Sequence, residues 1–352
     1  MKEIYLDNSA TTMAYPQVGD LVRKVMCQDY GNPSSMHRKG VEAEKYVKEA
    51  KERLAKLLKV EEKEIFFTSG GTESNNLALF GAAQANARSG KHVITTAVEH
   101  AAVGQPMERL AQMGYEVTVL PVDRTGVVDM KALEEALRPD TILVSTMYVN
   151  NEVGAVMPVE KIGALVHEKS PKALYHVDAI QAFGKYTIHP KKTGIDLLSV
   201  SSHKLHGPKG VGFLYIRKDQ PIRAFMHGGS QERHMRSGTE NVPGIAGMGK
   251  AVELGMKHGK EEAAYVKKLR NDTIKKLFRE IPYLRLNGDL HHRLPGNINI
   301  SFQFVEAQSL LVLLDMQGIC ASAGSACTSG DKGISHVLQA IHLREDLARG
   351  TL

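Results

Sequence analysis

The sequence predicts an α/β fold with a mostly parallel central sheet, helices on both faces of that sheet, and a smaller α+β domain. Two observations support this prediction. Between residues 65 and 177, short apolar segments alternate with longer segments whose apolar residues repeat at helical spacing. After about residue 240 the alternation stops, and helices precede an isolated strand. A βαβα order calls for parallel strands joined by crossover helices.

The chain is expected to begin with a strand and a long helix. Ile4-Tyr5-Leu6 is strand-like and runs into small polar residues at 7–12, and residues 31–35 are typical of a loop. Residues 38–58 are predicted to form an amphipathic helix, because apolar residues repeat there at helical spacing while Lys and Glu cover the other face.

The alternating part follows. The expected strands cover 65–67, 93–94, 117–120, 142–149, 174–177, 197–200 and 211–216, and the expected helices cover 73–87, 101–113, 130–137 and 159–168. Beyond it we expect helices at 242–257 and 260–279, a strand at 297–302 and a helix at 306–316. We therefore predict a large domain at 15–245 and a small domain made of 1–14 and 246–352, with a helix as a rigid junction.

Composition and charge exclude several classes of protein. The net charge of +6 is mild for 352 residues, and no basic stripe with aromatic residues suggests nucleic acid as a direct ligand. No apolar run is long enough to cross a membrane, and the N-terminus lacks an apolar signal region, so we expect a cytoplasmic protein. Cys27, Cys320 and Cys327 have no metal-ligand spacing, so no metal site is expected, and one of them could be a reactive thiol.

Lys204 lies where a lysine could act as an amine nucleophile. It follows the predicted strand 197–200, and Gly207 and Pro208 force a turn just behind it. Sheets of this class place their chemistry at the carboxyl ends of strands, where desolvation can remove the charge of a lysine. The alternative is a solvated loop lysine, and only the surrounding residues can exclude it.

A glycine-rich segment, Thr68-Ser-Gly-Gly-Thr-Glu-Ser-Asn75, joins one strand to the next helix. Free N–H groups at the start of a helix suit a phosphate. The spacing of Gly70 and Gly71 matches neither the dinucleotide fingerprint nor the Walker motif. A simple glycine turn with Thr72 as the helix cap is the alternative interpretation.

Other polar side chains follow neighbouring strands. Asp178 could hold a cationic ring nitrogen, and Gln181 could donate to a ring oxygen. His100 could stack on an aromatic cofactor and relay protons. Each has a simpler alternative, since Asp178 could cap a helix, His100 could be structural, and Asn150-Asn151 could belong to a turn.

Together these residues supply a phosphate cradle, a stacking ring, an amide, a carboxylate and a lysine. A phosphorylated, cationic aromatic aldehyde held as an imine needs this set. Pyridoxal 5′-phosphate (PLP) meets that description.

The chain resembles the NifS/IscS-like cysteine desulfurases of the class V aminotransferase group, over essentially its whole length. The resemblance implies the PLP-dependent transferase fold type I. It is carried by Tyr5-Leu-Asp-Asn-Ser-Ala-Thr-Thr12, Gly31-Asn-Pro-Ser34, Phe67-Thr-Ser-Gly-Gly-Thr-Glu-Ser-Asn75, Glu99-His100, Asn150-Asn-Glu-Val-Gly154, Asp178-Ala-Ile-Gln181, Ser201-Ser-His-Lys204, Arg236-Ser-Gly-Thr239 and Ser325-Ala-Cys327-Thr-Ser.

The resemblance implies three catalytic residues. Lys204 joins the cofactor aldehyde, His100 serves in proton transfer, and Cys327 accepts the sulfur of L-cysteine as a persulfide while L-alanine is released. For the cofactor it implies phosphate contacts by Gly71, Thr72, Ser201 and His203, a ring-nitrogen contact by Asp178, a ring-oxygen contact by Gln181, and contacts by Asn151 to cofactor and substrate. The resemblance also implies that Thr239 reaches the phosphate of a neighbouring subunit, and a shared site of this kind implies a homodimer.

The resemblance also implies where the sulfur goes. Residues 321–333 are small and glycine-rich, and we expect them to be mobile enough for Cys327 to visit the cofactor and then a sulfur acceptor. The acceptor would be an iron–sulfur scaffold or a tRNA-thiolation enzyme. Cys27 and Cys320 are expected to pack in the interior, and an inert, buried Cys327 is the alternative to a reactive one.

Other functions remain open at this point. They are an aminotransferase of the same fold, a selenocysteine lyase, and a docking scaffold for sulfur acceptors that has lost catalysis. Members of the resembling family continue for some tens of residues beyond the position of Leu352. That stretch carries the arginine that grips the substrate carboxylate, so we expect a truncated C-terminus and assign that role to no arginine here. Gly71 stands where such enzymes often have alanine.

Overall fold

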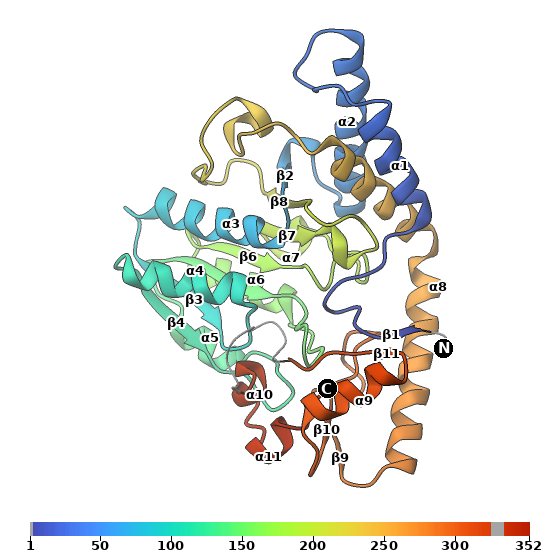
Figure 1. Ribbon diagram of the computed structural model, residues 1–352. Coiled ribbons are helices and arrows are strands. Elements are labelled where there is room, and N and C mark those ends of the chain that lie inside the picture. The colour runs from blue at the N-terminus through green and yellow to red at the C-terminus, as the bar shows by residue number, and fades with distance from the viewer. Residues whose placement is uncertain (1–2, 325–333) are drawn as a thin grey trace.

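A seven-stranded sheet with the order β2-β8-β7-β6-β5-β3-β4 forms the centre of the computed structural model, which describes residues 3–324 and 334–352 (Figure 1). Its strands are β2 (Ile65–Thr68), β3 (His92–Thr96), β4 (Glu116–Leu120), β5 (Thr141–Met147), β6 (Leu174–Asp178), β7 (Leu197–Ser201) and β8 (Gly212–Ile216). Of these strands, β8 alone runs in the direction opposite to the other six. The predicted mostly parallel sheet is thus confirmed.

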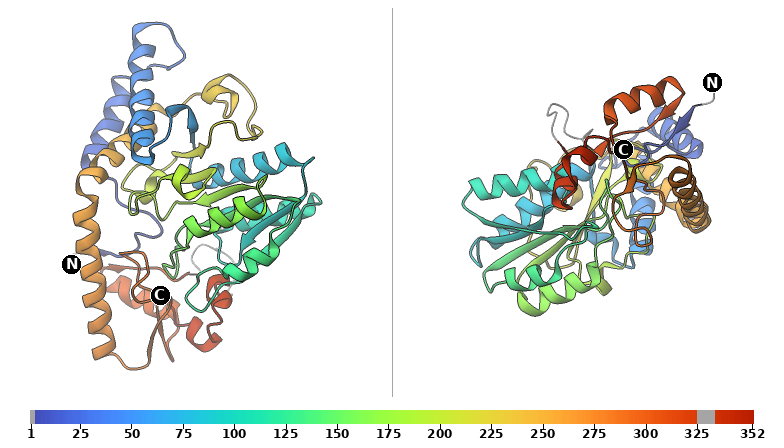
Figure 2. Two further views of the ribbon diagram at one scale, coloured as in Figure 1. Left: turned by 180° about the vertical axis from the view of Figure 1, so that it is seen from behind. Right: turned by 90° about the horizontal axis from the view of Figure 1, so that it is seen from below.

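Helices cover both faces of the sheet (Figure 2). One face carries α3 (Gly71–Asn86) and α4 (Ala101–Gln112), and the other carries α5 (Met130–Ala136), α6 (Val159–Lys169) and the short α7 (Pro190–Thr193). Two separate apolar clusters fill the layers, one with Leu79 and Leu110, the other with Ile162 and Val166. All residues of β5 are buried, and each of its faces carries apolar residues, Leu143 and Met147 on one and Ile142 and Val144 on the other.

Two helices stand beside this core. They are α1 (Pro16–Cys27) and α2 (Arg38–Leu58), and α2 has the predicted bounds. Cys27 is exposed at the end of α1, so the expectation that it packs in the interior was wrong. The strands and helices expected between 65 and 216 are all present, with ends that differ by a few residues.

One long helix, α8 (Val242–Glu280), replaces the two helices expected at 242–257 and 260–279. The expected break was wrong because no proline interrupts the segment, and Gly259 tolerates helical geometry at a modest energetic cost. The first half of α8 packs on α1 and α2, where Gly249 meets Ala50. The predicted domain boundary at 245 lies inside α8, and the division into two domains stays a prediction.

Beyond α8 the chain forms short elements. Two small sheets pair β1 (Ile4–Tyr5) with β11 (Ile319–Cys320) and β9 (Leu284–Leu286) with β10 (Ile300–Phe302). Helices α9 (Ala307–Met316), α10 (His336–Ala340) and α11 (Glu345–Ala348) complete this part. The strand expected at 297–302 is shorter, because Asn297 and Asn299 use their side chains to bind Glu152 and Asn287. Cys320 lies in a strand as expected but is only partly buried.

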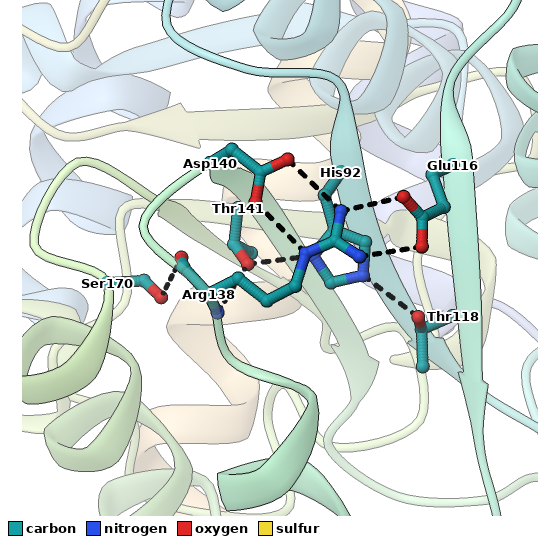
Figure 3. A network of polar contacts seen from close by, with 7 residues as sticks. All are labelled: His92, Glu116, Thr118, Arg138, Asp140, Thr141 and Ser170. Atoms are coloured by element: carbon teal, nitrogen blue, oxygen red, sulfur yellow. Dashed lines mark hydrogen bonds and ion pairs between the residues drawn. The ribbon is translucent and has the colours of Figure 1, made fainter.

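The amino edge of the central sheet is closed by a polar network (Figure 3). Arg138 donates to both carboxylate oxygens of Glu116, at 2.6 and 2.7 Å, and also to Asp140. The His92 ring bonds Thr141 and Thr118, each at 2.8 Å. The network therefore joins the starts of β3, β4 and β5, on the side of the sheet away from the strand ends described next. None of the helices described is long and apolar enough to cross a membrane.

Candidate active site

Polar side chains gather at the carboxyl ends of the parallel strands. The segments that directly follow β2, β3, β5, β6 and β7 carry, in that order, Gly71, His100, Asn151, Gln181 and Lys204, and Asp178 is the last residue of β6. Because these strands run in one direction, their ends meet at one edge of the sheet. The fold thus brings these predicted site residues to a common edge.

Lys204 lies in a short 3₁₀ turn, η2 (Ser202–Lys204), directly after β7. Its Nζ donates to the backbone oxygens of Ser9 and, at 2.7 Å, of Ala10. The N-terminal segment is held there by Thr12, which donates to the His203 carbonyl from its N–H at 2.9 Å and its hydroxyl at 2.8 Å. Lys204 is thus partly buried beneath residues 9–12, which excludes the solvated loop lysine. The motif analysis did not foresee this cover.

Asp178 is a buried carboxylate at the end of β6. Asn75 Nδ2 donates to its Oδ2 at 2.8 Å, and the Ile180 N–H donates to its Oδ1 at 3.0 Å. Burial raises the pKa of Asp178, while the two donors and the nearby groups His100 and Lys204 favour its charged form. No helix begins directly after Asp178, so it is not a helix cap. A cationic partner would offset the cost of burying it.

His100 stands at the start of α4 and lines a hollow of about 530 Å³ together with Thr72 and Asn76. Its Nδ1 accepts a hydrogen bond from the Ala102 N–H at 3.0 Å. Burial lowers the pKa of His100; the Asp178 carboxylate opposes this effect, and the charge of Lys204 adds to it. The ring is therefore neutral near pH 7, with its proton on Nε2, because Nδ1 needs its lone pair for the backbone.

The glycine segment turns tightly into α3. Gly70 has φ of +151°, a backbone conformation that favours glycine. A Cβ on Gly71 would stand 2.1 Å from Cδ1 of Ile180, so this site requires glycine while Ile180 keeps its place. Gly70 is the residue before the helix, and Thr72 lies inside its first turn, so Thr72 does not cap α3.

The other predicted cofactor residues lie around this edge. Ser201 is buried, and the Oγ of Ser202 beside it has no hydrogen-bond partner among the described atoms. His203 Nδ1 bonds Thr11 Oγ1 at 3.1 Å, and burial together with the charges of Lys204 and Lys209 lowers its pKa to about 4. Gln181 Nε2 donates to the Ser9 carbonyl at 3.0 Å.

Thr239 is exposed, on the segment that leads into α8. It lines a hollow of about 110 Å³ with Thr68, Ser69 and Arg236 of its own chain. The Arg236 guanidinium binds Glu73 in the first turn of α3 at 2.8 Å, and this ion pair ties the segment to the start of α3.

Cys327 and the predicted mobile segment around it lie outside the described residues, apart from 321–324. Gly324 and Ser335, which lie on either side of the segment that is not described, are both close to Glu152. Ser335 Oγ donates to Glu152 Oε2 at 2.6 Å, and a Cβ built on Gly324 would stand 2.3 Å from the same oxygen. Ser322 is bound to Asp7 at 2.6 Å.

These residues fit pyridoxal 5′-phosphate. A buried carboxylate could pair with a pyridinium nitrogen, an amine stands within its electrostatic reach, and a glycine turn opens a helix whose start suits a phosphate. Asn75 and the segment 9–12 are site residues whose contacts the sequence did not reveal. Their partners are more than a hundred residues away in the chain.

The model of the class V aminotransferase family matches residues 4–348, and the chain belongs to this family. Members of the family depend on PLP. Within it, the chain is similar to the proteins named cysteine desulfurase IscS. That of Dictyoglomus turgidum is 46% identical over 100% of this chain and 89% of its own length, and that of Methanosarcina thermophila is 46% identical over 100% and 86%.

Solved structures support the same family assignment. A NifS-like protein superposes with a TM-score of 0.94 at 39% identity, covering 99% of this chain and 92% of its own. SspA, solved in complex with cysteine, superposes with a TM-score of 0.87 at 33% identity, covering 99% and 97%. The predicted resemblance to NifS/IscS-like enzymes and the predicted fold are confirmed.

Proposed function

We propose that this chain is a cysteine desulfurase, which uses PLP to take the sulfur from L-cysteine, releases L-alanine and leaves the sulfur on Cys327. The single observation that carries the proposal is the meeting of Lys204, Asp178 and His100 at one sheet edge, each within electrostatic reach of another. Relatives that match over the whole chain and are named cysteine desulfurase support the same activity.

The predicted residues would hold the cofactor as follows. Lys204 would bind the aldehyde carbon, Asp178 the ring nitrogen and Gln181 the ring oxygen, with His100 against the ring. The phosphate would lie at the start of α3, within reach of Gly71, Thr72, Ser201 and His203, and Thr239 of a second copy would close it. Asn151 would contact cofactor and substrate. A helix start, with its unpaired N–H groups and positive dipole end, suits this anion.

When bound, PLP supplies a protonated pyridine ring that withdraws electrons from the carbon beside the substrate amine. Asp178 would keep the ring nitrogen protonated, because a buried carboxylate is stabilised by a positive partner. The Lys204 amine would accept the Cα proton of the substrate. The neutral His100 ring would offer its Nε2 proton to the reacting group, because its Nδ1 lone pair is already used by the Ala102 N–H.

The Cys327 thiolate attacks the sulfur of the substrate. A sulfur–sulfur bond forms, the carbon–sulfur bond breaks, and its electron pair passes to the substrate carbon skeleton. Protonation of that skeleton yields L-alanine, and a persulfide remains on Cys327. A thiolate is the reactive form of cysteine, so this step needs Cys327 deprotonated.

The proposal includes the partners. Two copies would form a homodimer, supported by the exposed side chains of Phe225 and Met226 beside the hollow that Phe80 lines. An iron–sulfur scaffold or a tRNA-thiolation enzyme would receive the sulfur. The cytoplasm is the compartment proposed, since its reducing conditions keep a thiol such as Cys327 from forming stable disulfides.

The test is to incubate the PLP-loaded protein with L-cysteine and a reductant and to measure alanine and sulfide together. We expect equal amounts of both from the unaltered protein, and loss of both with Cys327→Ser. Cys27→Ser removes an exposed thiol of α1 and is the matched control, with no loss expected.

Three outcomes would contradict the proposal. Alanine formation that survives Cys327→Ser would indicate a lyase that releases sulfur by another route. A keto acid in place of alanine would indicate an aminotransferase. PLP binding with neither alanine nor sulfide would indicate a docking scaffold without catalysis.

A further inference from the structure

A second lysine lies close behind the candidate site. Lys185 follows Gln181 by four residues, in the turns after β6, and its Nζ donates to Gln181 Oε1 at 3.4 Å. The other end of the same amide, Nε2, donates to the Ser9 carbonyl at 3.0 Å. That carbonyl also accepts a hydrogen bond from Lys204 Nζ. The amines of Lys185 and Lys204 are thus joined through one amide and one carbonyl.

The amine of Lys185 lies among many protein atoms although its side chain keeps some exposure. Burial lowers the pKa of Lys185 to about 8, and the charge of Lys204 contributes to this shift. At pH 7 Lys185 is therefore still mostly charged. Electrostatic repulsion is reciprocal, so a charged Lys185 disfavours a positive charge on Lys204 to the same extent.

Several other groups face Lys204. Asp178, at the end of β6, favours a positive charge on it. His100, before α4, and His203, in η2, both have lowered pKa values, so both are mainly neutral at pH 7. Lys209 is exposed on the following turn and acts on His203. Compared with these groups, Lys185 is the partly buried residue that brings a positive charge.

We propose that Lys185 is a positioning residue for the reaction, whose charge acts across Gln181 on Lys204 and favours the neutral, nucleophilic form of that amine. The inference rests on the proposed function, because Lys204 must be neutral to bind the cofactor aldehyde and to accept a proton. A neighbouring cation is one of the ways in which proteins activate a lysine nucleophile. The motifs that pointed to the site do not include Lys185.

The test measures the two amines directly in the folded, cofactor-free protein. Short pulses of formaldehyde with cyanoborohydride, from about pH 6 to about pH 10, label neutral amines, and mass spectrometry of the digest reads Lys204 and Lys185 separately. We expect Lys185→Met to raise the half-reaction pH of Lys204 by about one unit, a tenfold loss of neutral amine at neutral pH. Lys185→Arg keeps the charge, so it should leave the midpoint near that of the unaltered protein.

Lys192→Met is the matched control. Lys192 lies on α7 with 73% of its side chain exposed, and its loss should not move the Lys204 midpoint. A second readout uses the PLP-loaded protein, in which the absorbance of the bound cofactor is followed against pH. Its transition should move to higher pH in Lys185→Met and stay in place in Lys185→Arg.

An unchanged Lys204 midpoint in folded Lys185→Met would overturn the proposal, as would equal shifts in the Met and Arg variants. If the Met variant does not fold, labelling of Lys185 in the unaltered protein tests the proposal. If Lys185 is labelled as a neutral amine already at about pH 6, it carries no charge at about pH 7 that could act on Lys204, and the proposal is overturned. Alanine production from L-cysteine is measured separately. A midpoint shift without desulfuration would contradict the proposed function alone, and desulfuration without the shift would contradict this inference alone.

Discussion

Gly71 is a residue whose identity is set by one neighbour. A Cβ there would stand 2.1 Å from Ile180 Cδ1, and Ile180 sits between Asp178 and Gln181. We expect Gly71→Ala to weaken PLP binding and to cost about 1–3 kcal/mol of stability, because the Ile180 side chain must move. Ile180→Val removes the Cδ1 atom, so the double variant should recover most of both losses.

Equilibrium titration with PLP and urea unfolding measure these two effects. The single variant Ile180→Val is the control for the loss of a methyl group alone. Two results would contradict the explanation. One is a Gly71→Ala variant with unchanged affinity, and the other is a double variant no better than Gly71→Ala.

Glu99 is fully buried beside His100, and burial raises the pKa of Glu99 to about 8 from an ordinary value of 4.5. The Thr96 hydroxyl and the Met147 N–H donate to its Oε1 at 2.6 and 2.9 Å. The folded protein keeps this proton, whereas the unfolded chain releases it above about pH 4.5. The retained proton therefore contributes fully to the free energy of unfolding below about pH 4.5. This contribution is lost as the pH rises toward 8.

The substitution Glu99→Gln removes the titrating proton while keeping the shape of the side chain. We expect its free energy of unfolding to fall less steeply between about pH 5 and about pH 8, with a difference in slope of up to about 1.4 kcal/mol per pH unit. Urea unfolding across that range measures it. Parallel curves for the two proteins would mean that Glu99 does not hold a proton in the folded state.

At the scale of an element, the N-terminal part of the long helix α8 packs on α1 and α2 (Figure 1). Two of its glycines differ in their surroundings. A Cβ on Gly255 meets nothing within 4 Å, whereas one on Gly249 would approach Cβ and Cα of Ala50 in α2 at 3.0 and 3.1 Å. Gly249 therefore allows the two helices to approach closely, and Gly255 has no such role.

We expect Gly255→Ala to stabilise the protein by about 0.5–1 kcal/mol, because alanine favours a helix more than glycine does. Gly249→Ala gains the same helix preference but crowds Ala50, and it should be destabilising by about 1 kcal/mol. Thermal unfolding of the pair gives the comparison. If both substitutions stabilised the protein, the close packing of α2 on α8 would not be as described.

At the scale of the whole molecule, the proposed homodimer predicts that each active site needs two chains. Lys204 would serve its own site, and Thr239 would serve the site of the partner. We expect Lys204→Ala and Thr239→Ala proteins each to be impaired in producing alanine from L-cysteine. Mixed by unfolding and refolding together, they should form heterodimers that contain one site with both residues intact, and activity should return.

If Thr239 acted within its own chain, no site of the mixed dimer would be intact, and activity would stay low. Refolding each variant by itself is the control for recovery unrelated to mixing. Light scattering before and after mixing establishes whether two copies are joined, so that a failure to assemble is not mistaken for a failure to complement.

Much of the fold and of the site could be predicted from local patterns. The helix Arg38–Leu58 follows from apolar spacing, which depends only on residues close together in the chain. Asp178 and Lys204 could be placed at strand ends because a polar residue directly follows a buried strand. Helix continuity at Gly259 could not be predicted, because a glycine weakens a helix without ending it.

The sequence by itself determined the alternation of strands and helices, the glycine turn before α3, and the lysine, carboxylate and imidazole of the site. Only the tertiary structure decided that residues 9–12 cover Lys204, that Asn75 holds Asp178, and that Lys185 stands behind Gln181. Periodicity and turn chemistry act between neighbours in the chain, and so they can be read in order. Contacts between distant segments depend on the order of strands in the sheet and on what each layer buries, which no local pattern contains.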